Sequence, residues 1–203
     1  MMKLYYAAQT RAVRPRWMLE EIGAPYELVR VNLGAGEQKR PEYLALNPNG
    51  TVPTLVHDDL VLYESAAICQ HLADAFPGKK LAPPVGTAAR ALCYQWIHYA
   101  MSGLEPPAVT IFQHTMMKPE TERNPKLVEE ARPQLAAAVK VVDDALAGRD
   151  YMLGREFSAA DVMIGSTLMW CQMLGCVGPE RKHVGAYLAR VGARPAAQRA
   201  MAD

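Results

Sequence analysis

The fold is decided by the stretch Asn47-Pro48-Asn49-Gly50-Thr51-Val52-Pro53-Thr54-Leu55, a turn that leads into a proline directly before a predicted strand. Proline is costly inside a strand ladder because it has no N–H group to donate. If the Val52–Pro53 peptide bond is cis, the N–H and C=O groups of Val52 turn toward solvent, where they can pair with an extended peptide as an additional strand. The alternative interpretation is an ordinary proline on an edge strand.

The residues around this turn alternate between strand and helix patterns. A helix with one apolar face ends at Gly23, a short helix passes through Tyr43, and a further helix begins at Ser65 and ends before Pro77. Short apolar runs predict strands over residues 4–6, 26–31, 54–56 and 60–63. The resulting order, βαβαββα with a mixed four-stranded sheet and one antiparallel edge, is the thioredoxin-like topology.

The remainder of the chain has helical patterns only. Residues 79–86 are basic and contain prolines, which is typical of an exposed linker. One long helix is expected from about residue 87 toward residue 118, with a bend at Pro106 and Pro107, and the helix over residues 162–174 is apolar nearly all round. We therefore predict an α+β thioredoxin-like domain over residues 1–78, a linker over residues 79–86 and an all-α domain over residues 87–203.

The composition favours a globular protein that acts on small molecules. Lysine and arginine number 22 against 21 acidic residues, a net charge of +1, and the charges are spread along the chain. This balance gives no electrostatic reason to expect nucleic acid or an anionic membrane as a partner. No signal peptide and no membrane-spanning run is recognised, so a cytoplasmic location is expected. The four cysteines stand singly, which predicts buried, reduced thiols and no metal site.

A second informative feature is the junction Tyr63-Glu64-Ser65, where a predicted strand passes into a helix. The free N–H groups of a helix N-terminus and the Ser65 hydroxyl can bind a carboxylate, while Glu64 can pair with an ammonium group. Together they suit the head group of an α-amino acid. The alternative is that Ser65 is only an N-cap residue.

The proline turn and the Glu64-Ser65 junction together resemble the cytosolic glutathione transferase family, as does Leu19-Glu20-Glu21, and the likeness covers nearly the whole chain. The segment from Gln95 to Pro107 looks most like bacterial members. The resemblance implies that Val52, beside Pro53, binds the cysteinyl backbone of glutathione and that Glu64 and Ser65 bind its γ-glutamyl end. It also implies that glutathione is the co-substrate and that the protein is a homodimer.

Phe157-Ser158-Ala159-Ala160-Asp161-Val162 is similar to the capping box and hydrophobic staple of the same family. Ser158 as the N-cap residue and Asp161 three positions later can satisfy free N–H groups at the start of a buried helix, while Phe157 packs on Val162. We interpret this motif as structural.

The loop after the first strand is where the family places the group that stabilises the glutathione thiolate. Here Thr10 falls on the family's serine position, and its hydroxyl can donate; Arg11 beside it can share this task. Thr10 could instead cap the helix, and Arg11 could belong to a solvated basic face with Arg14 and Arg16. No cysteine occupies the loop, which argues against a mechanism through an enzyme–glutathione disulfide.

The other binding residues follow from the same resemblance. Gln38 and Thr51 lie where relatives contact the glycyl carboxylate. Both are neutral, so the charge for this contact is expected from Lys39 or from the partner subunit. An electrophile pocket is expected between the Thr10 loop and the long helix, where His98, Ser102 and Glu105 are spaced to share one face. A structural role for His98 is the alternative.

The predicted function is conjugation of glutathione, held as thiolate, to a small, largely apolar electrophile. Thiolate activation is also the basis of glutathione-dependent peroxide reduction and isomerisation, which the sequence does not separate from conjugation. A non-catalytic binding or assembly module is the remaining alternative, because Thr10 replaces the commoner donors.

Overall fold

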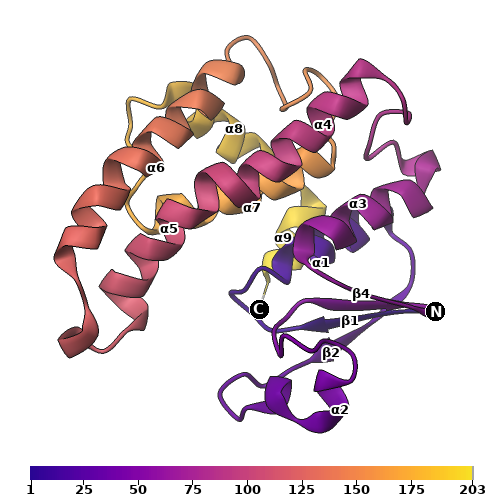
Figure 1. Ribbon diagram of the computed structural model, residues 1–203. Coiled ribbons are helices and arrows are strands. Elements are labelled where there is room, and N and C mark those ends of the chain that lie inside the picture. The colour runs from indigo at the N-terminus through magenta and orange to yellow at the C-terminus, as the bar shows by residue number, and fades with distance from the viewer. Residues whose placement is uncertain (203) are drawn as a thin grey trace. The chain divides into compact units, whose positions relative to one another are not determined.

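The computed structural model describes residues 1–202, which form two compact units (Figure 1). The first contains Met1–Ala82 together with the C-terminal residues from Ala193 on, and the second contains Pro83–Gly192. The division between Ala82 and Pro83 falls inside the predicted linker. The C-terminal helix packs with the first unit, whereas the predicted ranges place it in the all-α domain.

The first unit is built on a mixed sheet. Within the described residues it has four strands in the order β2-β1-β3-β4, with β1 parallel to β2 and antiparallel to β3. In Figure 1, α1 and α3 lie on one side of this sheet and α2 lies on the other. The predicted thioredoxin-like topology is confirmed. The elements are β1 (Met2–Tyr6), α1 (Val13–Ile22), β2 (Tyr26–Arg30), α2 (Pro41–Leu44), β3 (Thr54–His57), β4 (Leu60–Tyr63) and α3 (Ser65–Ala75).

Helix α1 follows the sequence pattern at both ends but not on its faces. Pro15 lies in the first turn, and Gly23 ends the helix in the left-handed conformation, with φ 69° and its N–H donated to Leu19 O at 2.9 Å. Arg14 and Arg16, however, are buried, with 3% and 9% of their surface exposed. The alternative that Arg11 belongs to a solvated basic face with Arg14 and Arg16 is therefore wrong. The guanidinium of Arg16 packs over the Tyr6 ring at 4.9 Å, which explains how a charged side chain is covered.

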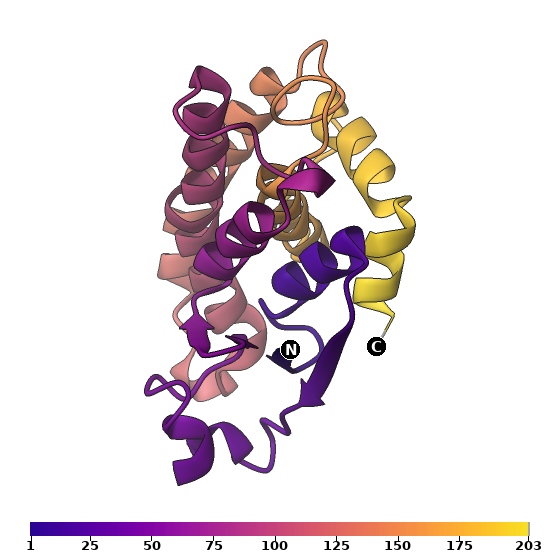
Figure 2. The same cartoon turned by 90° about the vertical axis from the view of Figure 1, so that its right-hand side faces the viewer.

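The C-terminal helix α9 (Pro195–Met201) is held against α1 by two arginine–glutamate pairs. Arg194 binds Glu21 through two hydrogen bonds of 2.7 and 2.8 Å, and Arg199 Nε donates to Glu20 at 2.6 Å. Both views show the indigo α1 beside the yellow helix that ends at the C-terminus (Figure 2). Paired, two-point hydrogen bonds of this kind are more specific than single ion pairs. Glu20 and Glu21 of the Leu19-Glu20-Glu21 motif thus hold α9 against α1.

The second unit is helical throughout its described elements. The predicted long helix is present, but Ala100–Leu104 and Gln113–Met117 are π-helical segments that the sequence pattern did not indicate. Pro106 and Pro107 lie in the first turn of α5, where a missing N–H group costs little. The elements are α4 (Ala88–Tyr99), α5 (Glu105–Phe112), α6 (Pro125–Ala145), α7 (Ala159–Met173) and α8 (Lys182–Gly192).

The capping box at the start of α7 is confirmed. Asp161 is fully buried and accepts hydrogen bonds from Met152 N at 2.8 Å, Ser158 N at 2.9 Å and Tyr187 OH at 3.2 Å. Burial raises the pKa of Asp161 to about 6, although these hydrogen bonds oppose the shift. Asp161 therefore joins the start of α7 to a preceding loop and to α8.

A histidine pair links β3 to α3 in the first unit. His57 Nδ1 and His71 Nε2 are 3.0 Å apart, so one ring donates a hydrogen bond to the other. Phe76 stacks on His57, Asp74 lies near His71, and Asp58 is 3.9 Å from His57 Nε2. Burial and the nearby His57 lower the pKa of His71, and Asp74 opposes this shift.

A pH-dependent contribution to stability is expected from His71. Because its pKa is lower in the folded than in the unfolded chain, unfolding takes up a proton below the ordinary histidine pKa of about 6.5, and stability is lost as the pH falls. In urea unfolding at pH 7.5 and pH 5.5, His71→Gln should lose less stability over this range than the wild type. His183→Gln, at an exposed position, should behave as the wild type. Equal losses in all three proteins would contradict the prediction.

Candidate functional site

The predicted site residues of the first domain gather at one end of the sheet. Thr54 of β3 is paired with Tyr5 of β1 on one side and with Tyr63 of β4 on the other. The loop after β1, the proline turn before β3 and the junction after β4 therefore leave the sheet at the same end. This register brings together segments that are separated by about half of the domain in sequence.

The proline turn adopts the predicted geometry. The Val52–Pro53 peptide bond is cis, and Val52 precedes β3, outside the paired register. Gly50 has φ 58°, and a Cβ atom there would lie 2.8 Å from Gln38 O, so both its conformation and its surroundings require glycine. Val52 is half-buried and Thr51 is exposed.

A buried polar network beneath the turn was not found from the sequence. Tyr43 OH donates to Thr51 O at 2.6 Å, and Asn47 Nδ2 donates to the same oxygen at 2.8 Å. Both side chains also contact Thr54 Oγ1, at 2.9 and 3.2 Å. Asn47 belongs to the quoted motif, but only the tertiary structure shows that its amide, with Tyr43, supports the backbone at Thr51.

Gln38 and Lys39 lie against this turn, as the predicted cluster requires. Lys39 Nζ donates to Asn49 O at 3.1 Å, and Gln38 Nε2 makes a weak bond to Leu33 O at 3.4 Å. Gln38 Oε1 is buried and has no hydrogen-bond partner among residues 1–202. The structure thus places Gln38 and Lys39 next to Asn49 and Gly50 of the turn.

The Glu64-Ser65 junction has a constrained backbone. Glu64 has φ 72° and ψ 112°, a conformation that is uncommon for a residue with a side chain and is often found at functional sites. Glu64 is the N-cap residue of α3, and Ser65 is its first helical residue, so the interpretation of Ser65 as the N-cap is wrong. Its hydroxyl is instead contacted by Arg14, whose Nη1 donates to Ser65 Oγ at 3.2 Å.

The Thr10 loop also contains an unusual backbone conformation. Gln9 has φ 56°, and the half-buried Thr10 follows it. Thr10 Oγ1 donates to Ala7 O at 2.7 Å and accepts from Ala12 N at 3.2 Å, so the hydroxyl organises the loop. Arg11 is exposed at the start of the turn into α1.

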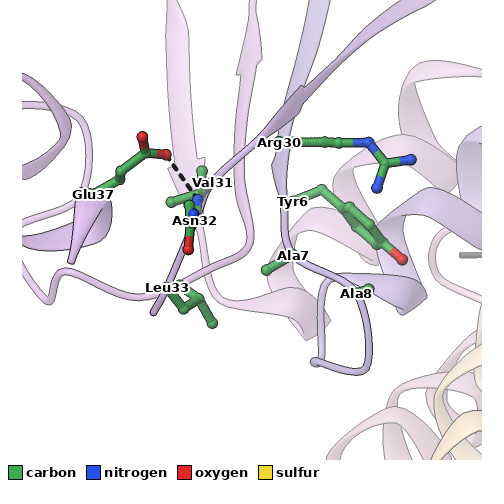
Figure 3. A pocket seen from close by; sticks show the side chains of 8 residues that line it. All are labelled: Tyr6, Ala7, Ala8, Arg30, Val31, Asn32, Leu33 and Glu37. Carbon is green, nitrogen blue, oxygen red and sulfur yellow. Dashed lines mark hydrogen bonds between the residues drawn. The ribbon is translucent and has the colours of Figure 1, made fainter. Parts of the chain in front are cut away.

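A cavity of about 450 Å³ lies beside this loop, at the ends of β1 and β2 (Figure 3). Ala7 and Ala8, which precede Thr10, form part of its wall, and Glu37 accepts a hydrogen bond from Asn32 N at 2.8 Å across from them. The sequence pattern did not indicate this cavity, because half of its wall comes from the residues after β2. Its lining residues are Tyr6, Ala7, Ala8, Arg30, Val31, Asn32, Leu33 and Glu37.

The predicted electrophile-binding residues lie in the second unit. His98 and Ser102 are exposed, and Ser102 Oγ donates to His98 O at 3.0 Å. Glu105 does not share their face, because only 4% of it is exposed. The π-helical segment Ala100–Leu104 contains Ser102 and lies between His98 and Glu105, so it changes the helical repeat on which the predicted face depended.

The described residues contain no helix that is long and apolar enough to cross a bilayer. Within residues 1–202 there is also no group of three or more histidine, cysteine, aspartate or glutamate side chains arranged to hold a metal ion. Cys69, Cys93 and Cys171 are buried thiols outside any disulfide, as predicted, whereas Cys176 is partly exposed. Burial raises the pKa of Cys69 to about 12, so this thiol is unreactive near neutral pH.

Both units match one protein family. Residues 1–74 match the glutathione S-transferase N-terminal domain, and residues 104–195 match the C-terminal domain. The chain belongs to the glutathione S-transferase family. A bacterial relative, glutathione S-transferase GstA from Escherichia coli O157:H7, is 30% identical over 202 residues, which cover 98% of this chain and 97% of the relative. The predicted family is confirmed.

Solved glutathione transferases have the same fold. The enzyme from Methylococcus capsulatus (Bath) has a TM-score of 0.87 and 34% identity, covering 100% of this chain and 98% of its own. A family member from Pseudomonas fluorescens Pf-5, with two glutathione bound, has a TM-score of 0.89 and 27% identity over 98% of this chain and 92% of its own. The predicted class of enzyme, a glutathione transferase, is confirmed, and the roles of individual residues stay predictions.

Proposed function

We propose that this glutathione transferase binds glutathione along the end of its sheet and conjugates its sulfur to a small, largely apolar electrophile. The observation that carries the proposal is the convergence of Val52, Ser65 and the Thr10 loop at one end of the sheet. An extended tripeptide lying there would meet a backbone pairing site, an anion site and a hydroxyl donor in succession.

Binding of the tripeptide uses its backbone and both of its ends. Val52, next to Pro53, pairs with the cysteinyl backbone, because it lies outside the sheet register with its backbone groups available. Glu64 and Ser65 bind the γ-glutamyl ammonium and carboxylate groups at the start of α3. The glycyl carboxylate is placed near Lys39, with Gln38 and Thr51 supplying neutral contacts.

Activation of the sulfur falls to Thr10, helped by Arg11. Thr10 Oγ1 now donates to Ala7 O, and rotation of the hydroxyl redirects this single hydrogen to a thiolate. A hydrogen bond and a nearby guanidinium both favour the charged sulfur. Ala7, Ala8 and Leu33 form an apolar part of the wall of the cavity beside the loop, next to the polar side chains of Arg30, Asn32 and Glu37.

The remaining expectations stand as follows. His98 and Ser102 are proposed as substrate-binding residues of the helical unit. A homodimer in the cytoplasm is proposed because the chain belongs to the glutathione S-transferase family. Glutathione is the co-substrate, and the proposed chemistry needs no metal ion.

Conjugation is tested by product analysis. The protein is incubated with glutathione and a panel of activated aryl halides and α,β-unsaturated carbonyl compounds, and thioether products are quantified by mass spectrometry. Enzyme-dependent thioether formation is expected. Formation of glutathione disulfide from a hydroperoxide, with no thioether from any electrophile, would contradict the proposed reaction and favour peroxide reduction on the same site.

Ser65→Ala should weaken glutathione binding and leave turnover at saturation nearly unchanged. Loss of a hydrogen bond to a charged carboxylate costs about 1.5–3 kcal/mol, which corresponds to an increase in Kd of roughly tenfold to a hundredfold. Calorimetric titration measures Kd, and initial rates at saturating glutathione measure kcat. Thr110→Ala, which removes a hydroxyl bonded only within α5, is the matched control. An unchanged Kd in Ser65→Ala would contradict its role.

A further inference from the structure

Arg14 is a buried cation directly beneath the anion site. It lies in the first turn of α1 with 3% of its surface exposed, and its Nη1 donates to Ser65 Oγ at 3.2 Å. Ser65 is itself only 3% exposed. This bond joins the start of α1, which follows the Thr10 loop, to the start of α3.

The chemistry of the two groups determines which way the serine hydroxyl points. A guanidinium has only donors, so Ser65 Oγ must accept in this bond. The hydroxyl hydrogen is then directed away from Arg14 and can be donated to an acceptor that binds at the start of α3. A ligand carboxylate is such an acceptor, and a ligand ammonium group is not.

The charge of Arg14 acts in the same direction. A buried cation is screened less than an exposed one, and it adds to the positive end of the α3 dipole. Its field also reaches Cys69 of the same helix: burial raises the pKa of that thiol, and the Arg14 charge opposes the rise. Both effects favour a negative group in front of Ser65.

We propose that Arg14 is a positioning residue that makes Ser65 a hydrogen-bond donor and selects ligands with a carboxylate at the γ-glutamyl position. The proposal rests on the proposed function, because it concerns the same glutathione site. It adds a specificity determinant that does not itself touch the ligand. A purely structural tether between α1 and α3 is the competing explanation.

The test compares two ligands on several variants. The ligands are glutathione and 4-aminobutyryl-cysteinyl-glycine, which lacks only the α-carboxylate of the γ-glutamyl group. Kd values are measured by calorimetry for the wild type, Arg14→Met and Arg14→Lys. The wild type should prefer glutathione, Arg14→Met should reduce that preference by roughly tenfold, which corresponds to about 1.4 kcal/mol, and Arg14→Lys should retain part of it.

The outcomes separate the explanations. If Arg14→Met weakens both ligands by the same factor, Arg14 is only a tether and the proposal is overturned. If Arg14→Met does not fold, the test uses Arg14→Lys, Ser65→Ala and the protein that carries both changes. Arg14→Lys should reduce the preference for glutathione in the wild type and have no further effect on it in Ser65→Ala, and equal effects in both would overturn the proposal. Wild-type protein that binds both ligands equally would overturn the proposal alone, whereas wild-type protein that binds neither would overturn the proposed function.

Discussion

Thr10→Val is expected to raise the pKa of the bound glutathione thiol and to lower kcat roughly tenfold to a hundredfold near neutral pH, because a charge-assisted hydrogen bond is worth about 1.5–3 kcal/mol. Valine keeps the shape of threonine and has a methyl group in place of the hydroxyl. The thiol pKa is read from the thiolate absorbance of the bound complex as the pH is raised, and kcat from initial rates with the electrophile found by product analysis.

Two controls make this result specific. Thr10→Ser retains the hydroxyl that bonds Ala7 O and Ala12 N, and should keep most of the activity. Arg11→Ala measures the contribution of the adjacent cation. Wild-type kcat and thiol pKa in Thr10→Val, together with a large loss in Arg11→Ala, would assign thiolate stabilisation to the guanidinium instead.

Asp161→Ala is expected to lower the free energy of unfolding by about 3–5 kcal/mol, because it leaves several buried donors without an acceptor. The donors that lose this acceptor are Met152 N, Ser158 N and Ser158 Oγ, whereas Tyr187 OH keeps the backbone carbonyl of residue 161 as an acceptor. The folded pKa of about 6 lies above the ordinary value of 3.8, so the folded chain holds this proton more tightly. The stability that Asp161 contributes is therefore lost as the pH rises from about 4 to 6. Over this range the difference in free energy of unfolding between the wild type and Asp161→Ala becomes smaller.

Chemical denaturation at pH 4.5 and pH 7 measures both effects. Ser158→Ala, at the same helix start, should cost only about 1 kcal/mol, because the backbone donors keep their acceptor. If Asp161→Ala lowers the free energy of unfolding by less than Ser158→Ala does, the role assigned to this network is contradicted.

Much of the fold was predictable because its signals are local. The apolar runs gave the strands, Gly23 marked the end of α1, and Ser158 with Asp161 marked the start of α7. The buried positions of Arg14 and Arg16 were not predictable from periodicity, since their cover comes from Tyr6 and Ser65 on other elements. The packing of α9 against α1 likewise depends on contacts between residues at opposite ends of the sequence.

The candidate site was predictable where it consists of a contiguous motif. Val52, Pro53, Glu64 and Ser65 belong to two short stretches, and the strand register brings these together. The network of Tyr43 and Asn47 and the contact of Arg14 were missed, because each joins residues whose proximity exists only in the folded sheet. The prediction that His98 and Glu105 share one helix face was wrong for a related reason, because a π-helical segment changes the helical repeat between them.

The central claim is that the site binds glutathione as its thiolate. Calorimetric titration with glutathione near pH 7, in two buffers of different ionisation enthalpy, counts the protons released on binding. We predict binding with release of a substantial fraction of one proton per site. The thiol of free glutathione is almost wholly protonated at this pH, whereas the thiol of bound glutathione is expected to be ionised. Binding without proton release, or no binding, would contradict the claim.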